Sequence, residues 1–484
     1  MEEQKNNSKD LVDQIYLSQQ EDDIASLIEV PLIPDNIQRG IELIKKKHLN
    51  SILFCCILSK FGIVLCLNLQ NENKETGINK EEYQIIMYFT LNILAQTFIG
   101  FMVDLISLKS AWLFTQTCSF LSIIVQIIST YTENDQGNLL ANFLLNFSFN
   151  CNYICGTYIL YDSSYQIRKR FNYQSFFVCI GSYIPYTISL LYNWFCIDLQ
   201  FFKTYVFQGM IYFCLVINFI GGIYITKLYG QVENARQKSQ NYQNALKYRG
   251  VGLTLKLIFR YYWNQNVIFL AVLLITMMSI SQIQNAAFLY DSIQNYHSFE
   301  TYKIDNSLKL LFYLSVIFIA TPLIFIINKQ KQIITSSFIV LRNLALILTC
   351  IQVIQTFLII FQDKLSLTLI FIISCIILVF KAIGYLLIHV LCNQLLISLQ
   401  SEKYSIKCIG LSFFGVFQDL TQIFYFIKLE PRIFSLLLSL AGILCTLYSF
   451  YYLKNRSFTI LENKLLEITD TQPNISKSSS LIQS

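Results

Sequence analysis

Three charged side chains lie deep inside long apolar stretches of this sequence: Lys60, Lys381 and Asp419. A charge at the centre of a bilayer costs about 2.5–3.5 kcal/mol on insertion scales, so each of these residues is a candidate for a functional role. A carboxylate or ammonium group in such a place attracts a solute of opposite charge strongly, because water is scarce around it. The chemistry indicated first is therefore the binding of a charged or polar solute.

Further polar side chains recur every three or four residues, a spacing that places them near one face of a helix. They are Asn142, Asn146 and Asn150; Ser279, Gln282 and Asn285; Lys381, Tyr385, His389 and Asn393; and Asp419 with Gln422. Such stripes either line a water-filled path or join helices by hydrogen bonds. For the Asn stripe the sequence leaves both interpretations open. For Asp419 and Lys381 it favours a cavity, with a mutually neutralising structural pair as the alternative.

Nothing in the sequence indicates catalysis. We find no paired nucleophile and base, no phosphate-binding loop and no spacing of metal ligands, so neither an enzyme nor a bound cofactor is expected. The net charge of +6 follows from an uneven distribution of lysine and arginine and gives no indication of nucleic-acid binding.

Membrane-spanning helices must position these residues. The composition is 54% hydrophobic and only 14% charged, whereas a soluble domain carries about a quarter charged residues. Twelve apolar stretches have the roughly 17–25 residues that a helix needs to cross a bilayer, and a single such segment can cross only as a helix, with all its backbone groups paired. The predicted spans are 51–69, 84–103, 110–130, 139–161, 172–193, 204–226, 267–289, 307–327, 333–361, 366–392, 405–427 and 433–453. We therefore predict an all-α membrane protein.

A basic polar segment separates the first six spans from the last six, a layout typical of secondary transporters. The predicted parts are an N-terminal tail with an amphipathic lead-in (1–50), a six-helix half (51–226), a central loop (227–266), a second six-helix half (267–453) and a C-terminal tail (454–484). Lysine and arginine concentrate in the tails, the central loop and the other segments of one side. Both termini are therefore predicted to be cytoplasmic, with the plasma membrane as the expected location. The sequence does not indicate an oligomeric state.

The loop after the second span carries Gly100, Asp104 and Lys109. These residues match part of the pattern Gly-x-x-x-Asp-Arg-x-Gly-Arg-Lys, and the chain thus resembles the major facilitator superfamily. The resemblance implies twelve helices in two six-helix halves, and a latch of acid–base pairs at the cytoplasmic ends of the helices. The residues implied in the latch are Gly100, Asp104, Lys109, Asp162, Lys169, Arg170 and Lys407.

Two further patterns resemble one branch, the organic cation, anion and carnitine transporters. Asp162 is followed seven residues later by Lys169, and Lys407, Gly410 and Asp419 stand at relative positions 0, 3 and 12. In the cation transporters of this branch, a substrate-binding aspartate occupies the last position. Departures from the branch include Gln400, which replaces an acidic residue.

The patterns together predict a transporter that moves a small organic cation by alternating access. The predicted substrate-binding residues are Asp419, Gln422, Gln282, Asn285, Asn146, Asn150, Lys60, Lys381 and Tyr385. One alternative is an organic anion or sugar carrier, with Lys60 and Lys381 as anion-binding groups. Another is a transport-inactive membrane receptor or assembly protein of the same fold. No acid–histidine pair at close spacing indicates proton coupling.

Overall fold

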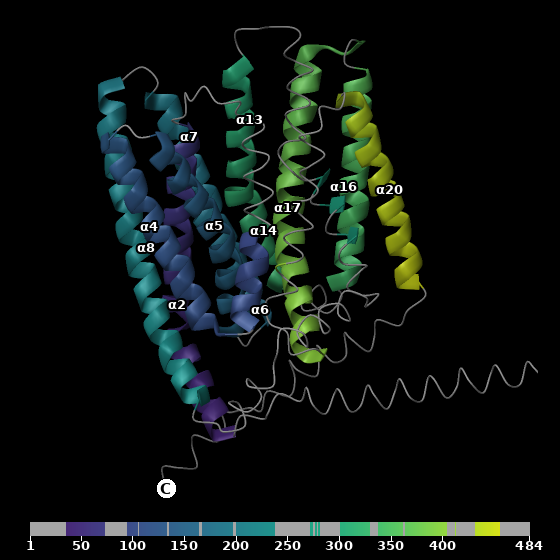
Figure 1. Ribbon diagram of the computed structural model, residues 1–484. Coiled ribbons are helices and arrows are strands. Elements are labelled where there is room, and N and C mark those ends of the chain that lie inside the picture. The colour runs from purple at the N-terminus through teal and green to yellow at the C-terminus, as the bar shows by residue number, and fades with distance from the viewer. Residues whose placement is uncertain are drawn as a thin grey trace, which may run out of the picture.

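The structure, a computed structural model, describes residues 35–72, 94–104, 106–132, 135–163, 167–196, 200–237, 301–329, 337–361, 364–403 and 431–454, with short pieces at 272–273, 276–277, 279–280 and 412. Within these ranges the regular elements are helices (Figure 1). They are α2 (Asp35–Glu72), a helix at Leu94–Asp104, α4 (Leu108–Thr132), α5 (Asp135–Ser163), α6 (Ile167–Val178), η1 (Cys179–Tyr183), α7 (Ile184–Cys196), α8 (Gln200–Gln237), α13 (Thr301–Ser315), η2 (Val316–Ala320), α14 (Thr321–Lys329), α16 (Ser337–Ile360), α17 (Leu367–Lys403) and α20 (Pro431–Lys454).

Eight of the described helices are long and apolar enough to cross a membrane. They coincide with the predicted spans 1, 3, 5, 6, 8, 9, 10 and 12. The fourth predicted span is α5, whose many asparagines lower its hydropathy. Of the predicted spans 7 and 11, the structure describes only short helical pieces. The all-helical prediction is thus confirmed in the described part of the chain.

The helices form two groups that stand side by side, α2 to α8 and α13 to α20 (Figure 1). The first group encloses two clusters of buried apolar residues, and the second encloses one. The cluster of the second group also takes in Val178 and Tyr183 of the first. The two halves therefore pack on each other through apolar side chains.

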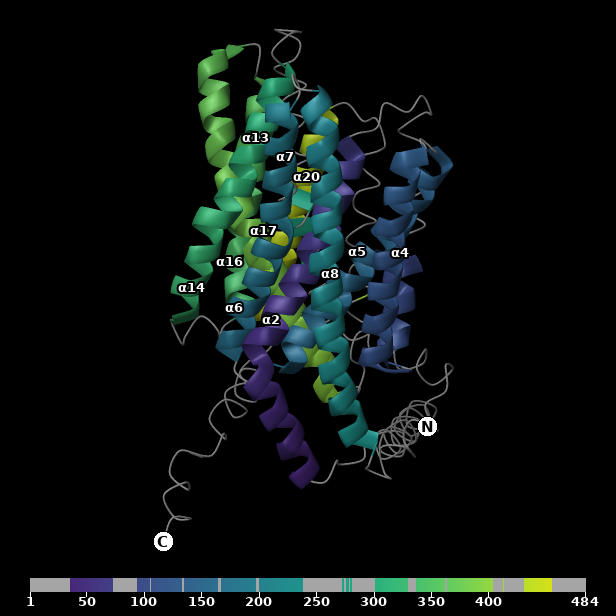
Figure 2. The same cartoon turned by 90° about the vertical axis from the view of Figure 1, so that its left-hand side faces the viewer.

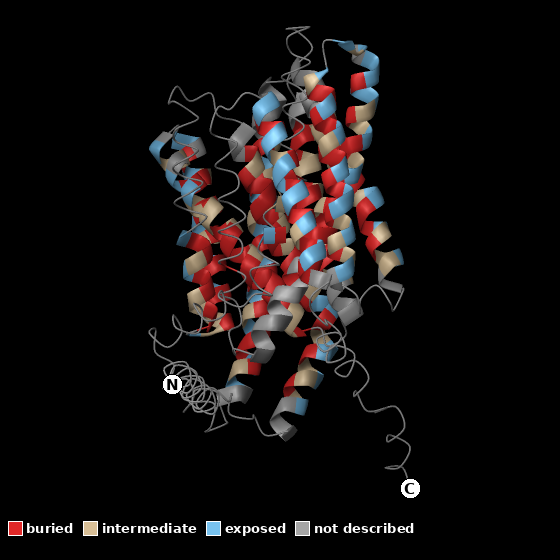
Figure 3. Cartoon of the chain, turned by 90° about the vertical axis from the view of Figure 1, so that its right-hand side faces the viewer, coloured by how far each residue is buried: buried red, intermediate tan, exposed pale blue. Residues whose placement is uncertain are grey.

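The outer faces of the bundle are apolar. Exposed side chains on α16 and α20 include Ile347, Ile354, Leu440, Leu444 and Leu447 (Figure 3). Contiguous exposed apolar surface of this kind is rare on soluble monomers and is what a lipid-facing helix presents.

Several helices continue past the predicted span boundaries. The predicted lead-in and the first span form one continuous helix, α2. The helix α8 extends to Gln237, into the predicted central loop, and α17 extends to Lys403. Neither extension contains a proline or glycine breaker other than Gly230, so the helical hydrogen bonding continues after the apolar residues end.

Two helices are interrupted at their middle by a widened π turn. The turn η1 joins α6 to α7, and η2 joins α13 to α14. In both cases a proline follows two residues after the turn, Pro185 and Pro322 respectively. A proline inside a helix lacks one N–H donor and its ring clashes with the carbonyl four residues earlier, so a wider turn relieves the clash. The two interrupted helices contact each other across the boundary between the halves.

Candidate functional site

Lys60 lies in the C-terminal half of α2, near the middle of the predicted first span, and only 2% of its surface is exposed. Its Nζ lies 4.3 Å from the centre of the Phe177 ring on α6 and 5.0 Å from that of the Tyr153 ring on α5. An ammonium group over aromatic faces is stabilised by the ring quadrupoles. The ion pair between Lys45 and Asp162 lies elsewhere, and no carboxylate among the described residues pairs with Lys60.

The turn η1 packs directly on the stem of Lys60. A Cβ atom placed on Gly181 would lie 3.0 Å from Lys60 Cδ and 3.2 Å from Lys60 Cβ, closer than side chains normally approach. Glycine at this position therefore lets the π turn contact the lysine. The combination of a glycine and a π turn positions the backbone of the fifth span against the carbon stem of Lys60.

Tyr153 connects Lys60 to the second half. The hydroxyl of Tyr153 lies 2.6 Å from Nε2 of His389, and Nδ2 of Asn393 donates to the same hydroxyl at 2.5 Å. Because Asn393 donates, Tyr153 can in turn donate to an unprotonated Nε2. His389 and Asn393 both belong to α17. One tyrosine of the first half is therefore bonded to two side chains of the second.

Aromatic rings from both halves surround this bridge. Tyr385 stacks on His389 with ring centres 5.7 Å apart, and meets Tyr183 of η1 edge-on at 6.2 Å. Tyr183 also contacts Phe312 and Tyr313 of α13, at 6.2 Å and 5.9 Å. The site is thus an ammonium, an imidazole, an amide and several phenol groups held between the two halves. Such a set can bind a small solute by charge and hydrogen bonds. The described residues contain no cluster of metal ligands.

Sequence comparisons find no matching family model and no matching curated protein. Comparison with solved structures does find matches. One is the crystal structure of a major facilitator superfamily transporter, FucP, in the outward conformation. Its TM-score is 0.55 and its identity 12%, over 83% of this chain and 98% of that chain. Another is a variant of the E. coli fucose:proton symporter FucP, with a TM-score of 0.54 and 12% identity, over 82% and 98%. The chain has the major facilitator fold. At this identity the similarity establishes the fold alone.

In this major facilitator fold, Lys381 lies apart from Lys60. Its Nζ donates to Oε1 of Gln355 and, at 3.3 Å, to Oε1 of Gln352, both on α16. Asn393, on the same helix, points instead toward α5. The reason is that four residues turn a helix through about 400°, so a four-residue stripe drifts by about 40° per step. Lys381 and Tyr385 were predicted to share one face of α17. Because of this rotation they have different neighbours: Lys381 contacts α16, whereas Tyr385 contacts Tyr183 and His389.

The two halves of the fold contain corresponding polar clusters. In the first half, Ser59 is bonded to Gln116 of α4, Asn152 of α5 and Asn218 of α8. In the second, Lys381 of α17 and Ser435 of α20 are bonded to Gln352 of α16. The helices involved are the predicted spans 1, 3, 4 and 6 in the first half and the predicted spans 9, 10 and 12 in the second. Lys381 therefore takes part in an intra-half network like the one around Ser59.

The asparagine stripe makes hydrogen bonds mainly within α5. Nδ2 of Asn146 donates to the carbonyl oxygen of Asn142 at 2.9 Å, and Nδ2 of Asn150 donates to that of Asn146 at 3.0 Å. Gln96, on the helix Leu94–Asp104, donates to Oδ1 of Asn150 at 3.3 Å. These contacts favour the helix-joining interpretation for Asn150.

Of the predicted latch residues, Asp162 has a described ion pair. Nζ of Lys45 on α2 lies 2.5 Å from Oδ2 of Asp162 at the end of α5, and Tyr229 of α8 donates to the same oxygen at 3.4 Å. This ion pair lies within the first half. Asp104 is buried, and Nζ of Lys109 lies beside α8, 3.4 Å from where a Cβ of Gly230 would be. Gly100 is buried in the helix Leu94–Asp104.

Other predicted residues lie outside the described structure. They are Asp419, Gln422, Gln282, Asn285 and Lys407, together with the side chains of Lys169 and Arg170, whose backbone belongs to α6. Their roles remain predictions.

Sequence reasoning missed three contributors to the site, Tyr153, Phe177 and Tyr183. Aromatic residues are so frequent in the spans, with 39 Phe and 30 Tyr, that their type alone distinguishes none of them. The prolines Pro185 and Pro322 were the available signal for the two π turns.

Proposed function

We propose that this protein is a secondary transporter that moves a small organic solute across a membrane by alternating access. The observation that carries the proposal is the position of Lys60, a buried ammonium at the boundary between the halves of a major facilitator fold, bridged through Tyr153 to the other half. A buried charge without a counter-ion costs several kcal/mol. A protein retains such a group where a ligand neutralises it during function.

The described groups are best suited to an organic anion or a hydroxylated neutral solute. A carboxylate would pair with Lys60 and accept hydrogen bonds from the phenol and amide donors around it, and a bound anion would remove the cost of the lone ammonium. One similar structure is described as a fucose:proton symporter. A sugar is compatible with the same hydrogen-bonding groups.

An organic cation is the second candidate. It is supported by the spacing of Lys407, Gly410 and Asp419 in the sequence and by the aromatic rings near Tyr385, which can hold a cation by cation–π contacts. Under this hypothesis Asp419 supplies the counter-charge, with Gln422, Gln282 and Asn285 orienting the solute. Lys60 would then repel the substrate unless Asp419 screens it.

Uptake into proteoliposomes separates these candidates. The purified full-length chain is supplied in parallel with a labelled monocarboxylate, a labelled hexose and labelled tetraethylammonium. We expect uptake of the monocarboxylate or the hexose. For the monocarboxylate, Lys60→Gln should reduce uptake about 10- to 100-fold, the effect of losing one charged hydrogen bond, and Lys60→Arg should retain part of it.

The matched variant is Asp419→Asn. Uptake of tetraethylammonium that Asp419→Asn abolishes and Lys60→Gln leaves intact would establish the cation hypothesis instead. If the folded and inserted protein takes up none of the three solutes, the proposal that it transports solutes of these classes is wrong. The receptor or assembly role would then be favoured.

A further inference from the structure

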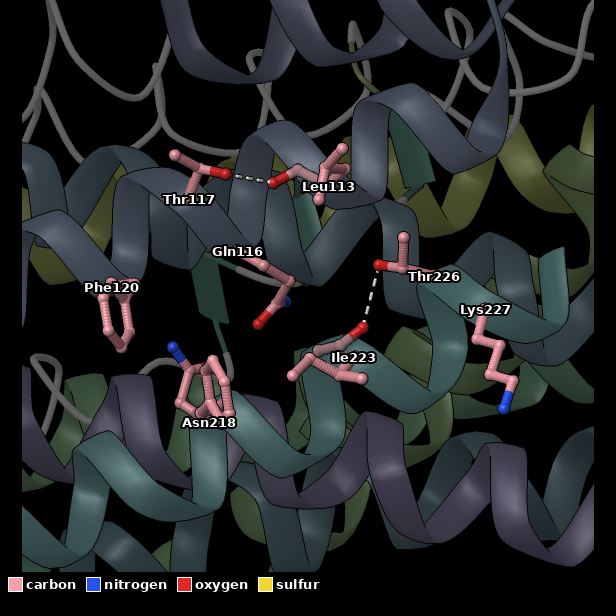
Figure 4. Close-up of a pocket in the computed structure, with 10 residues that line it drawn as sticks. Leu113, Gln116, Thr117, Phe120, Asn218, Ile223, Thr226 and Lys227 are labelled. Atoms are coloured by element: carbon pink, nitrogen blue, oxygen red, sulfur yellow. Dashed lines mark hydrogen bonds between the residues drawn. The ribbon is translucent and has the colours of Figure 1, made fainter. Parts of the chain in front are cut away.

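A groove lies between α4 and α8 on the outer side of the first half, away from the site around Lys60. Both helices stand at the edge of the bundle in Figure 1, and Figure 2 turns that side toward the viewer. The groove has a volume of about 390 Å³ and is lined by Leu113 and Phe120 of α4 and by Phe219 and Ile223 of α8, among others (Figure 4). Leu113, Phe219 and Ile223 are half exposed. The groove therefore opens onto the lipid-facing surface.

Two polar side chains form the floor of the groove, but their polar atoms are bonded inward. Gln116 and Asn218 are buried, and both are held by Ser59 of α2. Asn218 also donates to Ser119 at 2.6 Å. The surface that the groove presents to an occupant is therefore mainly apolar.

Gly222 keeps the groove hollow. A Cβ atom at this position would lie 2.9 Å from Oε1 of Gln116 and 3.0 Å from its Cγ. The glycine thus lets α8 approach α4 at the floor without a side chain projecting between them.

The groove has the length of one lipid leaflet and a positive charge at one end. From Asn218 to Lys227 the helix rises about 14 Å, about half of the roughly 30 Å of hydrocarbon in a bilayer. Lys227 is exposed and directly follows the predicted sixth span. Nζ of Lys109 reaches α8 one turn further along, beside Gly230. Two ammonium groups therefore stand at the level where the headgroups of that leaflet lie.

We propose that this groove binds one acyl chain of an anionic glycerophospholipid, whose headgroup lies against Lys227. The length of the groove, its apolar lining and the charge at its end fit this occupant together. A zwitterionic lipid fits the lining but gains less from the lysines. None of the residues that line the groove belongs to the site around Lys60.

The test uses the full-length chain in liposomes of phosphatidylcholine containing a trace of a photoactivatable phospholipid with a diazirine in its acyl chain. The probe carries either a phosphatidylglycerol or a phosphatidylcholine headgroup, and labelled peptides are identified by mass spectrometry. We expect the phosphatidylglycerol probe to label the α4 and α8 peptides about fivefold more than the phosphatidylcholine probe. One lysine near an anionic headgroup raises the affinity by about this factor.

Two variants and two matched controls complete the test. Lys227→Gln should reduce the preference for phosphatidylglycerol, whereas Lys46→Gln, at another exposed lysine of the same end, should not. Ile223→Trp should fill the groove and reduce labelling by both probes, whereas Ile220→Trp should not, since Ile220 is equally exposed at 52% but lies outside the groove. Equal labelling of the wild type by the two probes would overturn the proposal. So would labelling that neither variant changes, because ordinary annular lipid would behave in that way.

Discussion

At the scale of single residues, Tyr153 is the group through which the two halves share hydrogen bonds at the site. Its ring lies beside Lys60 while its hydroxyl contacts His389 and Asn393. Any movement that separates α5 from α17 must break these two bonds. The residue therefore couples the environment of the buried charge to the opening of the interface between the halves.

Replacing Tyr153 by Phe should retain the ring over Lys60 and remove both hydrogen bonds across the interface. Each bond contributes about 0.5–1.5 kcal/mol, so the ratio of the opened to the closed state should rise about 5- to 150-fold. Distances between spin labels on α5 and α17 would measure the shift. Tyr131→Phe is the control, because it removes a tyrosine–tyrosine hydrogen bond to Tyr212 that lies within the first half. Unchanged populations in Tyr153→Phe would show that the bridge does not stabilise the closed state.

The two buried lysines should respond differently to replacement by Met. Lys381 is bonded to two glutamines inside the second half, so Lys381→Met removes the ammonium donor of two buried glutamine oxygens and should destabilise the fold by about 1–3 kcal/mol. Lys60→Met removes a buried charge that no described carboxylate neutralises, so stability should stay unchanged or rise while solute uptake falls. Thermal unfolding and the KM of uptake, measured on both variants, check this contrast. A raised KM with unchanged stability in Lys381→Met would return Lys381 to the substrate site.

At the scale of elements, the apolar spans were predictable and their interruptions were not predicted. Hydropathy places a span to within a few residues because the thickness of the bilayer fixes its length. The π turns η1 and η2 leave hydropathy unchanged, and only Pro185 and Pro322 mark them. The four-residue stripe on α17 was predicted to form one face, but Lys381 and Asn393 bond to different helices. Spacing alone therefore could not show which helix each of these side chains contacts.

Pro185→Ala should allow α6 and α7 to join in a regular helix. A π turn holds one residue more than a regular helical turn. If η1 became regular, Tyr183 and Gly181 would rotate relative to Lys60, so uptake should fall by an order of magnitude or more. Stability should rise, because a proline inside a helix costs about 3 kcal/mol. Uptake rate and thermal unfolding test this on the same preparation. Pro431→Ala is the control, since Pro431 is the first residue of α20, where proline is tolerated. Wild-type uptake in Pro185→Ala would mean that the turn has no role in transport.

At the scale of the whole molecule, the two interrupted helices contact each other at two levels. Phe176 of α6 and Phe325 of α14 have ring centres 4.8 Å apart, and these two helices lie below α7 and α13 in Figure 1. Tyr186 of α7 stacks on Tyr313 of α13 at 5.4 Å, above the π turns. The division into two halves could be predicted from the central basic segment. These contacts could not, because they join residues far apart in the sequence that belong to no recognised motif.

Alternating access requires that the lower contact level separates in one half of the transport cycle and the upper level in the other half. A reversible metal bridge at either level should therefore stop transport. Zn²⁺ binds histidine nitrogens at about 2.0–2.1 Å, so the pair Phe176→His and Phe325→His should bind it across the lower contact, and the pair Tyr186→His and Tyr313→His across the upper one. Zn²⁺ should block uptake in each double variant, chelation should restore it, and the four single variants serve as controls because one histidine cannot bridge the helices. Uptake that continues in both zinc-loaded double variants would show that the halves do not move apart along α6–α7 and α13–α14.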